Sequence, residues 1–259
     1  MNTQTDLIVR WDTFLEKIST RFQESLKHAE TACSEQLVET DYEYETVFRS
    51  WQGMKAQIYE LIRKIDTVWD GKVMPEMRAM GDFYTDEAAK GSQLNDSLTE
   101  TLFGFERQLE GKLSRAYYDH AIQSADKKSL CTQCDAKLAI RKDIFRAQYI
   151  SCPYCNTVNT IEPDTKFVKL GWGIIDNIAA MNCQKEYAAM ENALSALHAL
   201  RKSERGVAEW ASYENAYFRY WEKYFQERIV LNADAKERYV ADMERKRKEF
   251  ENYKEIQTK

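Results

Sequence analysis

Glycine, proline and histidine are scarce in this chain. Its 259 residues include nine Gly, three Pro and three His, whereas charged residues make up 31% of the total. Strands and tight turns need Gly and Pro more often than long helices do, so this scarcity predicts a mainly α-helical protein with few turns. With 44% hydrophobic and 12% aromatic residues, the chain has enough apolar material to bury a sizeable core and is not a disordered segment.

Membrane-spanning and export signals are also missing from the sequence. No apolar run approaches the roughly 20 residues that a membrane-spanning helix needs. The first six residues lack the basic start and the apolar stretch of a signal peptide. We therefore expect a cytoplasmic protein.

No recognisable catalytic constellation is present. The three histidines, His28, His120 and His198, stand apart from one another and outside any His-Glu-x-x-His motif. The sequence has neither a Gly-x-x-x-x-Gly-Lys phosphate loop nor a dinucleotide-binding fingerprint. Neighbouring acids such as Glu43 and Glu45 are ordinary on charged helices. We expect the protein not to be an enzyme, and we predict no catalytic residues and no small-molecule substrate.

Four of the six cysteines form the motif with the most definite chemistry. Cys131-Thr-Gln-Cys134 and Cys152-Pro-Tyr-Cys155 are two Cys-x-x-Cys turns, or knuckles, separated by seventeen residues. Each knuckle supplies two thiolates to one edge of a tetrahedron. The pair therefore predicts one structural Zn²⁺ held by four cysteines, with no open position for water or substrate. Redox dithiols, an iron-sulfur cluster and unligated buried cysteines are the alternatives.

The residues around the knuckles favour zinc. Asp135 and Asn156 follow the second cysteine of each knuckle, and both residue types tolerate the left-handed backbone conformation that eases such a bend. Residues 137–141, 147–151 and 158–161 carry branched and aromatic side chains suited to strands. We therefore predict a small three-stranded zinc ribbon.

This region resembles the broad C4 zinc-ribbon group, whose second knuckle often reads Cys-Pro-x-Cys-Gly. Here the corresponding segment reads Cys152-Pro153-Tyr154-Cys155-Asn156, and the resemblance covers about residues 129–164. It implies metal binding and no particular biological role.

The seventeen-residue spacing is also similar to that of the DnaK-suppressor zinc fingers, which combine such a finger with a helical hairpin and act on RNA polymerase. Those proteins are shorter, carry the finger near the C-terminus and present acidic residues at the hairpin tip. This chain places the finger centrally and continues for about a hundred residues beyond it.

Apolar residues recur at helical spacing on both sides of the predicted ribbon. We predict helices over about residues 8–29, 44–70, 95–124, 174–200, 207–230 and 234–253. The third helix should begin at Asn95 or Asp96, after a loop over 81–91. Within it, Gly111 indicates either a close approach by another helix or simple tolerance of glycine. The interrupted heptad-like spacing suits a bundle, helical hairpins or short coiled coils.

Three regions follow from these patterns. Residues 1–125 form an N-terminal helical region, 126–168 the inserted C4 ribbon, and 169–259 a C-terminal helical region that packs with the N-terminal helices. Because a small ribbon brings its entrance and exit together, the two helices that flank it should pack antiparallel.

Aromatic residues concentrate between Trp210 and Phe225, where half of the sixteen positions are aromatic. At helical spacing they occupy more than one face. A central bundle helix packed on two sides, a surface for a partner or for self-association, and a base-stacking platform are the three interpretations. The last needs unpaired basic residues among the aromatics, and here acids match them.

The charge pattern gives no strong basic footprint. The net charge is −5, and the basic run from Arg245 to Lys248 is bordered by Glu244 and Glu249, as on a solvated helix face. Four thiolates leave a zinc centre with two negative charges, which basic residues near the knuckles could balance: Lys137, Arg141, Lys142 and Arg146.

We therefore predict a non-enzymatic, zinc-binding helical adaptor or structural subunit of a larger assembly. It would bind a protein partner, or a second copy of itself, through helix faces and the ribbon. The first alternative is a zinc-ribbon regulator that contacts nucleic acid or the transcription machinery. The second is a peripheral membrane-associated helical protein.

Overall fold

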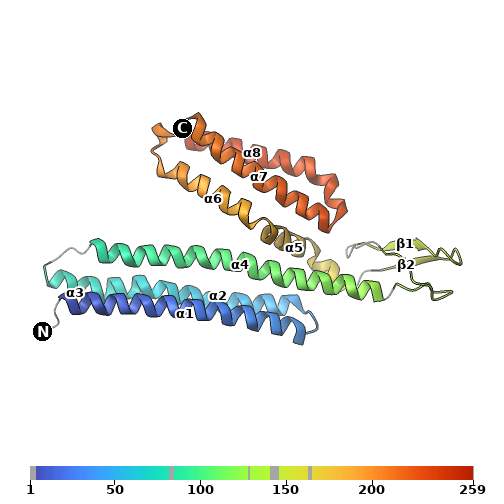
Figure 1. Cartoon of the computed structure of the whole chain (residues 1–259), viewed down its shortest axis with the longest axis horizontal. Coiled ribbons are helices and arrows are strands. Elements are labelled where there is room, and N and C mark those ends of the chain that lie inside the picture. The colour runs from blue at the N-terminus through green and yellow to red at the C-terminus, as the bar shows by residue number, and fades with distance from the viewer. Residues whose placement is uncertain (1–3, 82–84, 128, 141–145, 163–164, 259) are drawn as a thin grey trace. The chain divides into compact units, whose positions relative to one another are not determined.

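The computed structural model describes residues 4–81, 85–127, 129–140, 146–162 and 165–258. Within them the chain is mainly helical, as predicted, with one small antiparallel sheet (Figure 1). The elements are α1 (Gln4–Glu39), α2 (Tyr44–Val68), a π-helical turn (Trp69–Val73), α3 (Met74–Ala79), α4 (Thr85–Lys127), β1 (Gln148–Ser151), β2 (Val158–Ile161), α5 (Thr165–Asn182), α6 (Gln184–Ala199), a 3₁₀ turn (Lys202–Glu204), α7 (Val207–Leu231), a second 3₁₀ turn (Ala233–Arg238) and α8 (Tyr239–Thr258).

The chain divides into two compact units, residues 1–109 and 110–259. Helices α1 to α3 and most of α4 belong to the first unit. The last part of α4, the sheet and helices α5 to α8 belong to the second. Both knuckles therefore lie in the second unit.

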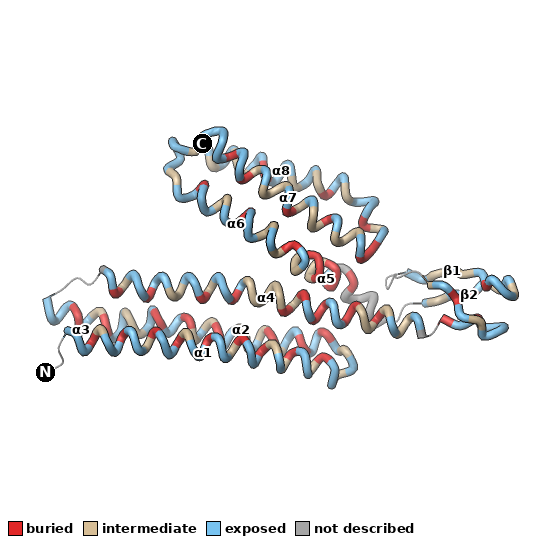
Figure 2. Tube along the Cα trace, in the orientation of Figure 1, coloured by how far each residue is buried: buried red, intermediate tan, exposed pale blue. Residues whose placement is uncertain are grey.

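Helix α1 of the first unit presents one apolar stripe, which packs along α2 (Figure 2). The buried positions repeat every eleven residues: Leu7, Ile18 and Ala29, then Trp11, Phe22 and Cys33, then Leu15, Leu26 and Leu37. An eleven-residue repeat corresponds to about 3.67 residues per turn, close to the 3.6 of a straight helix. The stripe therefore stays on one side of the helix along its whole length.

Two expectations about the first unit were wrong. The helix predicted to end near residue 70 continues through a π-helical turn containing Gly71 into α3, where Pro75 lies in the first turn. Helix α4 begins at Thr85, ten residues before Asn95, so most of the predicted loop over 81–91 is helical. Residues 82–84 of that loop lie outside the described residues.

Gly91 indicates a turn in the sequence, but in the structure it lies within α4 and makes room for a packed side chain. A Cβ placed on it would lie 2.8 Å from Cζ2 of Trp11. The Trp11 indole N–H donates to the carbonyl of Glu87, one turn earlier on α4, at 3.1 Å. The glycine thus lets the ring of a buried tryptophan lie directly against the α4 backbone.

In the second unit, the end of α4 packs antiparallel to α5, the first helix after the ribbon, as predicted. A Cβ on Gly111 would lie 2.3 Å from Cβ of Met181, and Asn177 Nδ2 donates to Ser114 Oγ at 3.2 Å. Residue numbers rise along α4 as they fall along α5, which fixes the antiparallel direction. Gly111 therefore marks a close approach of two helices.

The helix predicted over residues 174–200 is divided in two at Cys183, which has φ −99° and ψ 19° between α5 and α6. The sequence has no Gly or Pro between residues 174 and 200, so no local signal marks the break. Cys183 is fully buried in a cluster with Met190 and Leu197 of α6, and tertiary packing overrides helix propensity here.

Helix α7 is a central helix, in agreement with the first of the three interpretations of its aromatic segment. It packs against α5, α6 and α8. Trp210, Tyr213 and Tyr220 are buried in a cluster that also takes Phe250 from α8, and Tyr217 and Trp221 pack against it half-buried. The aromatic faces of α7 are thus covered by neighbouring helices of the same unit.

Among the described residues the sheet has two strands, and the predicted third strand is not observed. β1 and β2 pair antiparallel, with Tyr149 opposite Thr160 and Ile150 opposite Asn159. In the first predicted strand, over 137–141, the described residues form one isolated bridge, between Leu130 and Lys137, and Arg141 lies outside the described residues.

Candidate metal centre

The two knuckles are closed by the same pair of backbone hydrogen bonds. In the first, the Cys131 N–H donates to the Ala136 carbonyl at 2.8 Å, and the Asp135 N–H donates to the Cys131 carbonyl at 3.0 Å. The second knuckle repeats both bonds at the same distances, starting from Cys152. Backbone hydrogen bonds alone therefore fix the first cysteine of each knuckle and close the turn that follows it.

The left-handed residues predicted after each knuckle are observed. Asp135 has φ 55° and Asn156 has φ 60°. Asp and Asn adopt this conformation at lower cost than other residues apart from glycine. The sequence therefore meets the backbone requirement of both knuckles without a glycine.

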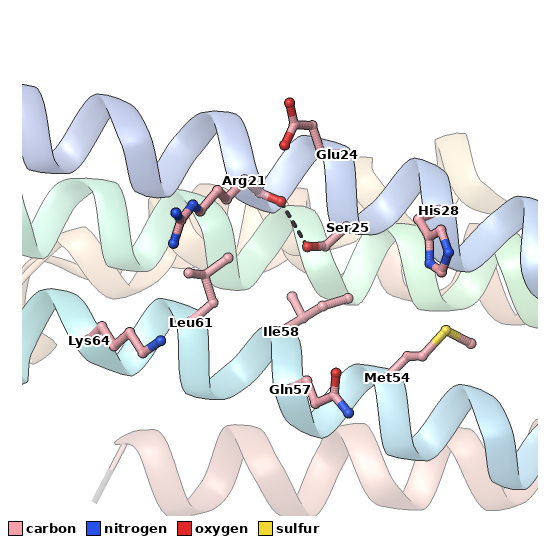
Figure 3. Close-up of a pocket in the computed structure, with 9 residues that line it drawn as sticks. All are labelled: Arg21, Glu24, Ser25, His28, Met54, Gln57, Ile58, Leu61 and Lys64. Carbon is pink, nitrogen blue, oxygen red and sulfur yellow. Dashed lines mark hydrogen bonds between the residues drawn. The ribbon is translucent and has the colours of Figure 1, made fainter.

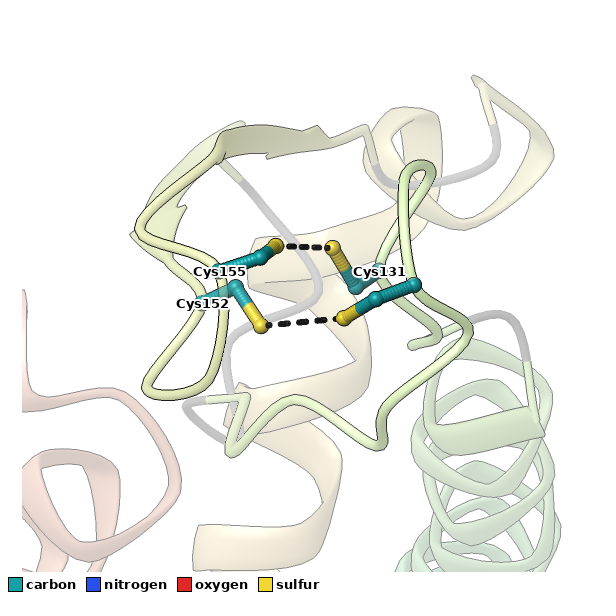
Figure 4. A group of neighbouring side chains, drawn as sticks. Cys131, Cys152 and Cys155 are labelled. Carbon is teal, nitrogen blue, oxygen red and sulfur yellow. Dashed lines mark hydrogen bonds between the residues drawn. The ribbon is translucent and has the colours of Figure 1, made fainter.

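The structure brings all four predicted ligands together. Cys131 Sγ lies 3.5 Å from Cys155 Sγ, and Cys134 Sγ lies 3.6 Å from Cys152 Sγ, so each close pair joins the two knuckles (Figure 4). All four sulfur atoms lie within 4.8 Å of one another. In a tetrahedral site with Zn-S bonds of about 2.3 Å, sulfur atoms are about 3.8 Å apart. The cluster can therefore hold one metal ion.

The ligands differ in their exposure to solvent. Cys131 and Cys152 are fully buried in a small apolar cluster with Leu138, whereas Cys155 is half-buried and Cys134 is exposed. Four protein ligands would leave no open coordination position, yet the edge at Cys134 faces water. A chelator can therefore reach a bound ion from that side.

The thiols of the first knuckle also differ in acidity. A hydrogen bond from the backbone N–H of Gln133 lowers the pKa of the Cys131 thiol to about 6. Although the backbone N–H of Ala136 acts in the opposite direction, hydrogen bonds with the other thiols, that of Cys155 first, raise the pKa of Cys134 to about 12. A metal ion deprotonates the thiols that coordinate it, so binding here would release protons and strengthen with rising pH.

Asn159 is a site residue that the sequence reading missed. It lies on β2, is 2% exposed, and contacts both knuckles through its side-chain amide. The sequence predicts the strand that carries Asn159 from its branched residues alone and gives the amide no role. The available signal was an amide in the middle of a strand, because Asn is depleted from strands unless something holds it there.

Two of the four basic residues considered as counter-charges are paired elsewhere. Lys137 lies 3.0 Å from the carboxylate of Asp126, and Arg146 lies 3.0 Å from that of Asp234. Arg141 and Lys142 lie outside the described residues. Lys137 and Arg146 therefore have carboxylate partners outside the cysteine cluster.

The histidines stay apart in the structure. His120 and His198 lie beside the hydroxyl groups of Ser124 and Tyr253, at 3.4 and 2.6 Å. His28 borders a groove of about 440 Å³ between α1 and α2, whose floor includes Ile58 (Figure 3). The side chains that line this groove suggest no particular reaction.

Comparison with known proteins gives no relative: no family model, no curated protein and no solved structure matches this chain. The resemblance to zinc ribbons thus depends on the cysteine cluster itself.

None of the helices, as far as the structure describes them, is long and apolar enough to cross a membrane.

Proposed function

We propose that this chain is a non-enzymatic, zinc-binding helical adaptor or structural subunit of a larger assembly. The observation that carries the proposal is the cluster of four cysteine Sγ atoms within 4.8 Å. It is built on a sheet that has two strands among the described residues. A two-stranded hairpin is marginally stable by itself in water, and a structural zinc ion supplies folding free energy directly. The metal would therefore hold the shape of the ribbon.

The donor set favours zinc over other cations. Four thiolates in a tetrahedron suit Zn²⁺ or an iron-sulfur centre, whereas Mg²⁺ and Ca²⁺ prefer oxygen ligands. A single ion fits sulfur atoms that are all within 4.8 Å. A cytoplasmic location is part of the proposal, because thiols stay reduced there.

The outward face of the ribbon supports a docking role. Side chains alternate along β1 and β2, so Tyr149 and Val158 point away from the cysteine cluster while Ile150 and Asn159 point toward it. Tyr149 is 76% exposed, Val158 62%, and Tyr154 in the second knuckle 78%. Tyrosine is enriched in protein-protein interfaces because it offers a large apolar ring together with a hydroxyl group. These three residues form the proposed docking face.

Pairing of the basic side chains favours a protein partner over nucleic acid. Near the ribbon, Lys137 and Arg146 contact carboxylates. In the basic run of α8, Arg245 contacts Asp242, and Lys246 lies 3.7 Å from the centre of the Trp221 ring. A protein that binds duplex DNA usually needs basic groups available for phosphates. Binding to nucleic acid or to a membrane surface is therefore the alternative outcome of the test.

Site-specific photocrosslinking tests the docking face. A photoreactive phenylalanine analogue at Tyr154 should capture a discrete protein from extracts of the native organism, or a second copy of the chain. The same analogue at Val240, 77% exposed on α8, is the matched control. Capture at Tyr154 should be lost in the Tyr149→Ser variant and retained in Val240→Ser. Equal capture at both positions, or capture of nucleic acid or lipid alone, would contradict the adaptor role.

A further inference from the structure

We propose that Asn159 is a positioning residue for the metal centre: its side-chain amide fixes the first knuckle to β2 and donates a hydrogen bond to the sulfur of Cys131. The inference rests on the proposed metal-binding function of the four cysteines and adds a residue that is not a ligand. It follows from the way every hydrogen-bonding position of this amide is used.

The oxygen of the amide holds the first knuckle. Oδ1 accepts from the backbone N–H of Thr132 at 2.8 Å and from the Thr132 hydroxyl at 3.0 Å. Thr132 is the residue directly after the first cysteine ligand. The amide therefore restrains the knuckle at the point where Cys131 leaves the backbone.

The nitrogen of the amide faces the second knuckle and the metal ligands. Nδ2 donates to the Thr157 carbonyl at 2.9 Å and to Cys131 Sγ at 3.6 Å. A carboxamide offers two N–H groups and two oxygen lone pairs. All four are used here, on a side chain that is 2% exposed.

The orientation of this amide is fixed by its partners. If oxygen and nitrogen were exchanged, the oxygen would face a carbonyl and a sulfur, which are both acceptors, and the NH₂ group would face the Thr132 N–H, which is a donor. A buried polar group in that arrangement would lose its hydrogen bonds at a substantial cost. One orientation is therefore allowed, and it aims an N–H at the sulfur.

Such a contact strengthens a thiolate metal site in two ways. Four thiolates around Zn²⁺ carry two net negative charges, and an N–H donor draws electron density from one sulfur. The bonds to Thr132 also reduce the freedom that the first knuckle loses on binding. Residues that orient metal ligands typically change metal affinity about 10- to 100-fold when they are replaced.

The second knuckle has no equivalent donor from a buried side chain among the described residues. Cys155 Sγ contacts the Thr157 hydroxyl at 3.4 Å. This hydroxyl donates a hydrogen bond to the side-chain oxygen of Gln133. Gln133 is exposed and Thr157 is half-buried, so water can replace the contact with Gln133. Asn159 should therefore affect metal binding more than either of them does.

The test compares Asn159→Ala, which removes all four bonds, with Asn159→Asp, which keeps the acceptor for Thr132 and removes the donors to Cys131 and to the Thr157 carbonyl. Thr160→Ala, at the exposed neighbouring position on β2, is the matched control. The affinity for Zn²⁺ is measured in the full chain by competition with a chromogenic chelator. Both Asn159 variants should bind about 10- to 100-fold more weakly than Thr160→Ala.

A second measurement separates positioning from folding. At saturating Co²⁺, used as a probe ion, the sulfur-to-cobalt charge-transfer band should move to lower energy in both Asn159 variants. The band should stay in place in Thr160→Ala, because only the Asn159 variants lose a hydrogen-bond donor to the sulfur. Retained helical circular dichroism confirms that the helices of the variants are folded, and uptake of Co²⁺ confirms that the ribbon can still form the site.

Three results would overturn the inference. Affinities within twofold of the control would show that the amide has no role at the metal. A large affinity loss with an unchanged band would show a purely structural role. Failure of both Asn159 variants to take up Co²⁺ would make Asn159 a folding residue. Failure of the wild-type protein to bind Zn²⁺ or Co²⁺ would instead remove the proposed metal site itself.

Discussion

In the ribbon, the buried apolar cluster consists of Cys131, Leu138 and Cys152, two of which are predicted metal ligands. In the helices α6 to α8, the corresponding cluster contains Met190, Leu197, Trp210, Tyr213, Tyr220 and Phe250, with further aromatic rings packed around it. One region has few side chains to bury, and the other buries many. The comparison indicates that the ribbon, unlike the helices α6 to α8, has too few buried apolar side chains to hold its shape by apolar contact.

This contrast has a physical cause. A fully buried large apolar side chain contributes about 1.5–3 kcal/mol, so a cluster as small as that of the ribbon cannot offset the entropy of ordering its knuckles. The cluster of helices α6 to α8 buries enough aromatic rings to offset the entropy of ordering its helices. We therefore expect the two regions to respond differently to the same perturbation.

Metal removal should give the largest effect. Chelation should raise amide hydrogen exchange throughout residues 129–162. Helices α6 to α8 should stay protected, and most helical circular dichroism should remain. The reason is that the free energy of metal binding contributes to the folding of the ribbon and not to that of the helices. Adding Zn²⁺ back should restore protection. Collapse of the helical signal on chelation would show instead that the metal organises the whole fold.

Truncation in the aromatic cluster should give the reverse pattern. Trp210 is 3% exposed and packs edge-on against Phe250 and Tyr253. Trp210→Ala should lower the free energy of unfolding by about 3–5 kcal/mol, measured by chemical denaturation, and leave the zinc content unchanged. Val207→Ala, at an 89% exposed position one turn earlier, is the control. Normal stability together with weakened self-association in Trp210→Ala would show that the aromatic surface of α7 is an interface between copies of the chain.

A smaller effect is expected where α4 meets α5. The added Cβ of Gly111→Ala would meet backbone-proximal atoms of Met181 at 2.3 Å, so overpacking should cost about 1–3 kcal/mol. Gly173→Ala, on α5, meets nothing within 4 Å and should be neutral or stabilise by up to about 1 kcal/mol. Thermal unfolding of both variants measures the difference. Equal melting temperatures would show that the two helices separate easily.

The smallest effect should come from the ion pairs around the ribbon. Lys137 and Asp126 are 67% and 50% exposed, and exposed pairs contribute about 0–1 kcal/mol. Lys137→Gln should therefore change neither the zinc affinity nor the stability by more than about 1 kcal/mol. A large loss of zinc affinity would restore Lys137 as a counter-charge of the metal centre.

Sequence patterns predicted the parts of this molecule that depend on local chemistry. The clustering of the four cysteines, the left-handed Asp135 and Asn156, and the strand Val158–Ile161 all follow from residue types at fixed spacing. Periodic apolar residues likewise located the body of each long helix. Spacing along the chain determines these features, so a single sequence is enough to infer them.

The errors fall where distant contacts decide the structure. Gly91 indicated a loop because its partner, the Trp11 ring, lies on another helix. The break at Cys183 has no local signal, and the role of Asn159 depends on a knuckle more than twenty residues earlier in the chain. Tertiary contacts of this kind leave only weak traces in a single sequence, such as an amide in the middle of a strand.

The metal content of the purified protein tests the central claim most directly. Elemental analysis should find one zinc ion per chain in the wild-type protein and in Cys33→Ala, which alters a buried cysteine of α1. In Cys152→Ser, which removes one of the four clustered sulfur atoms, the zinc should be lost. A wild-type protein without zinc, or a Cys152→Ser variant with as much zinc as Cys33→Ala, would contradict the account.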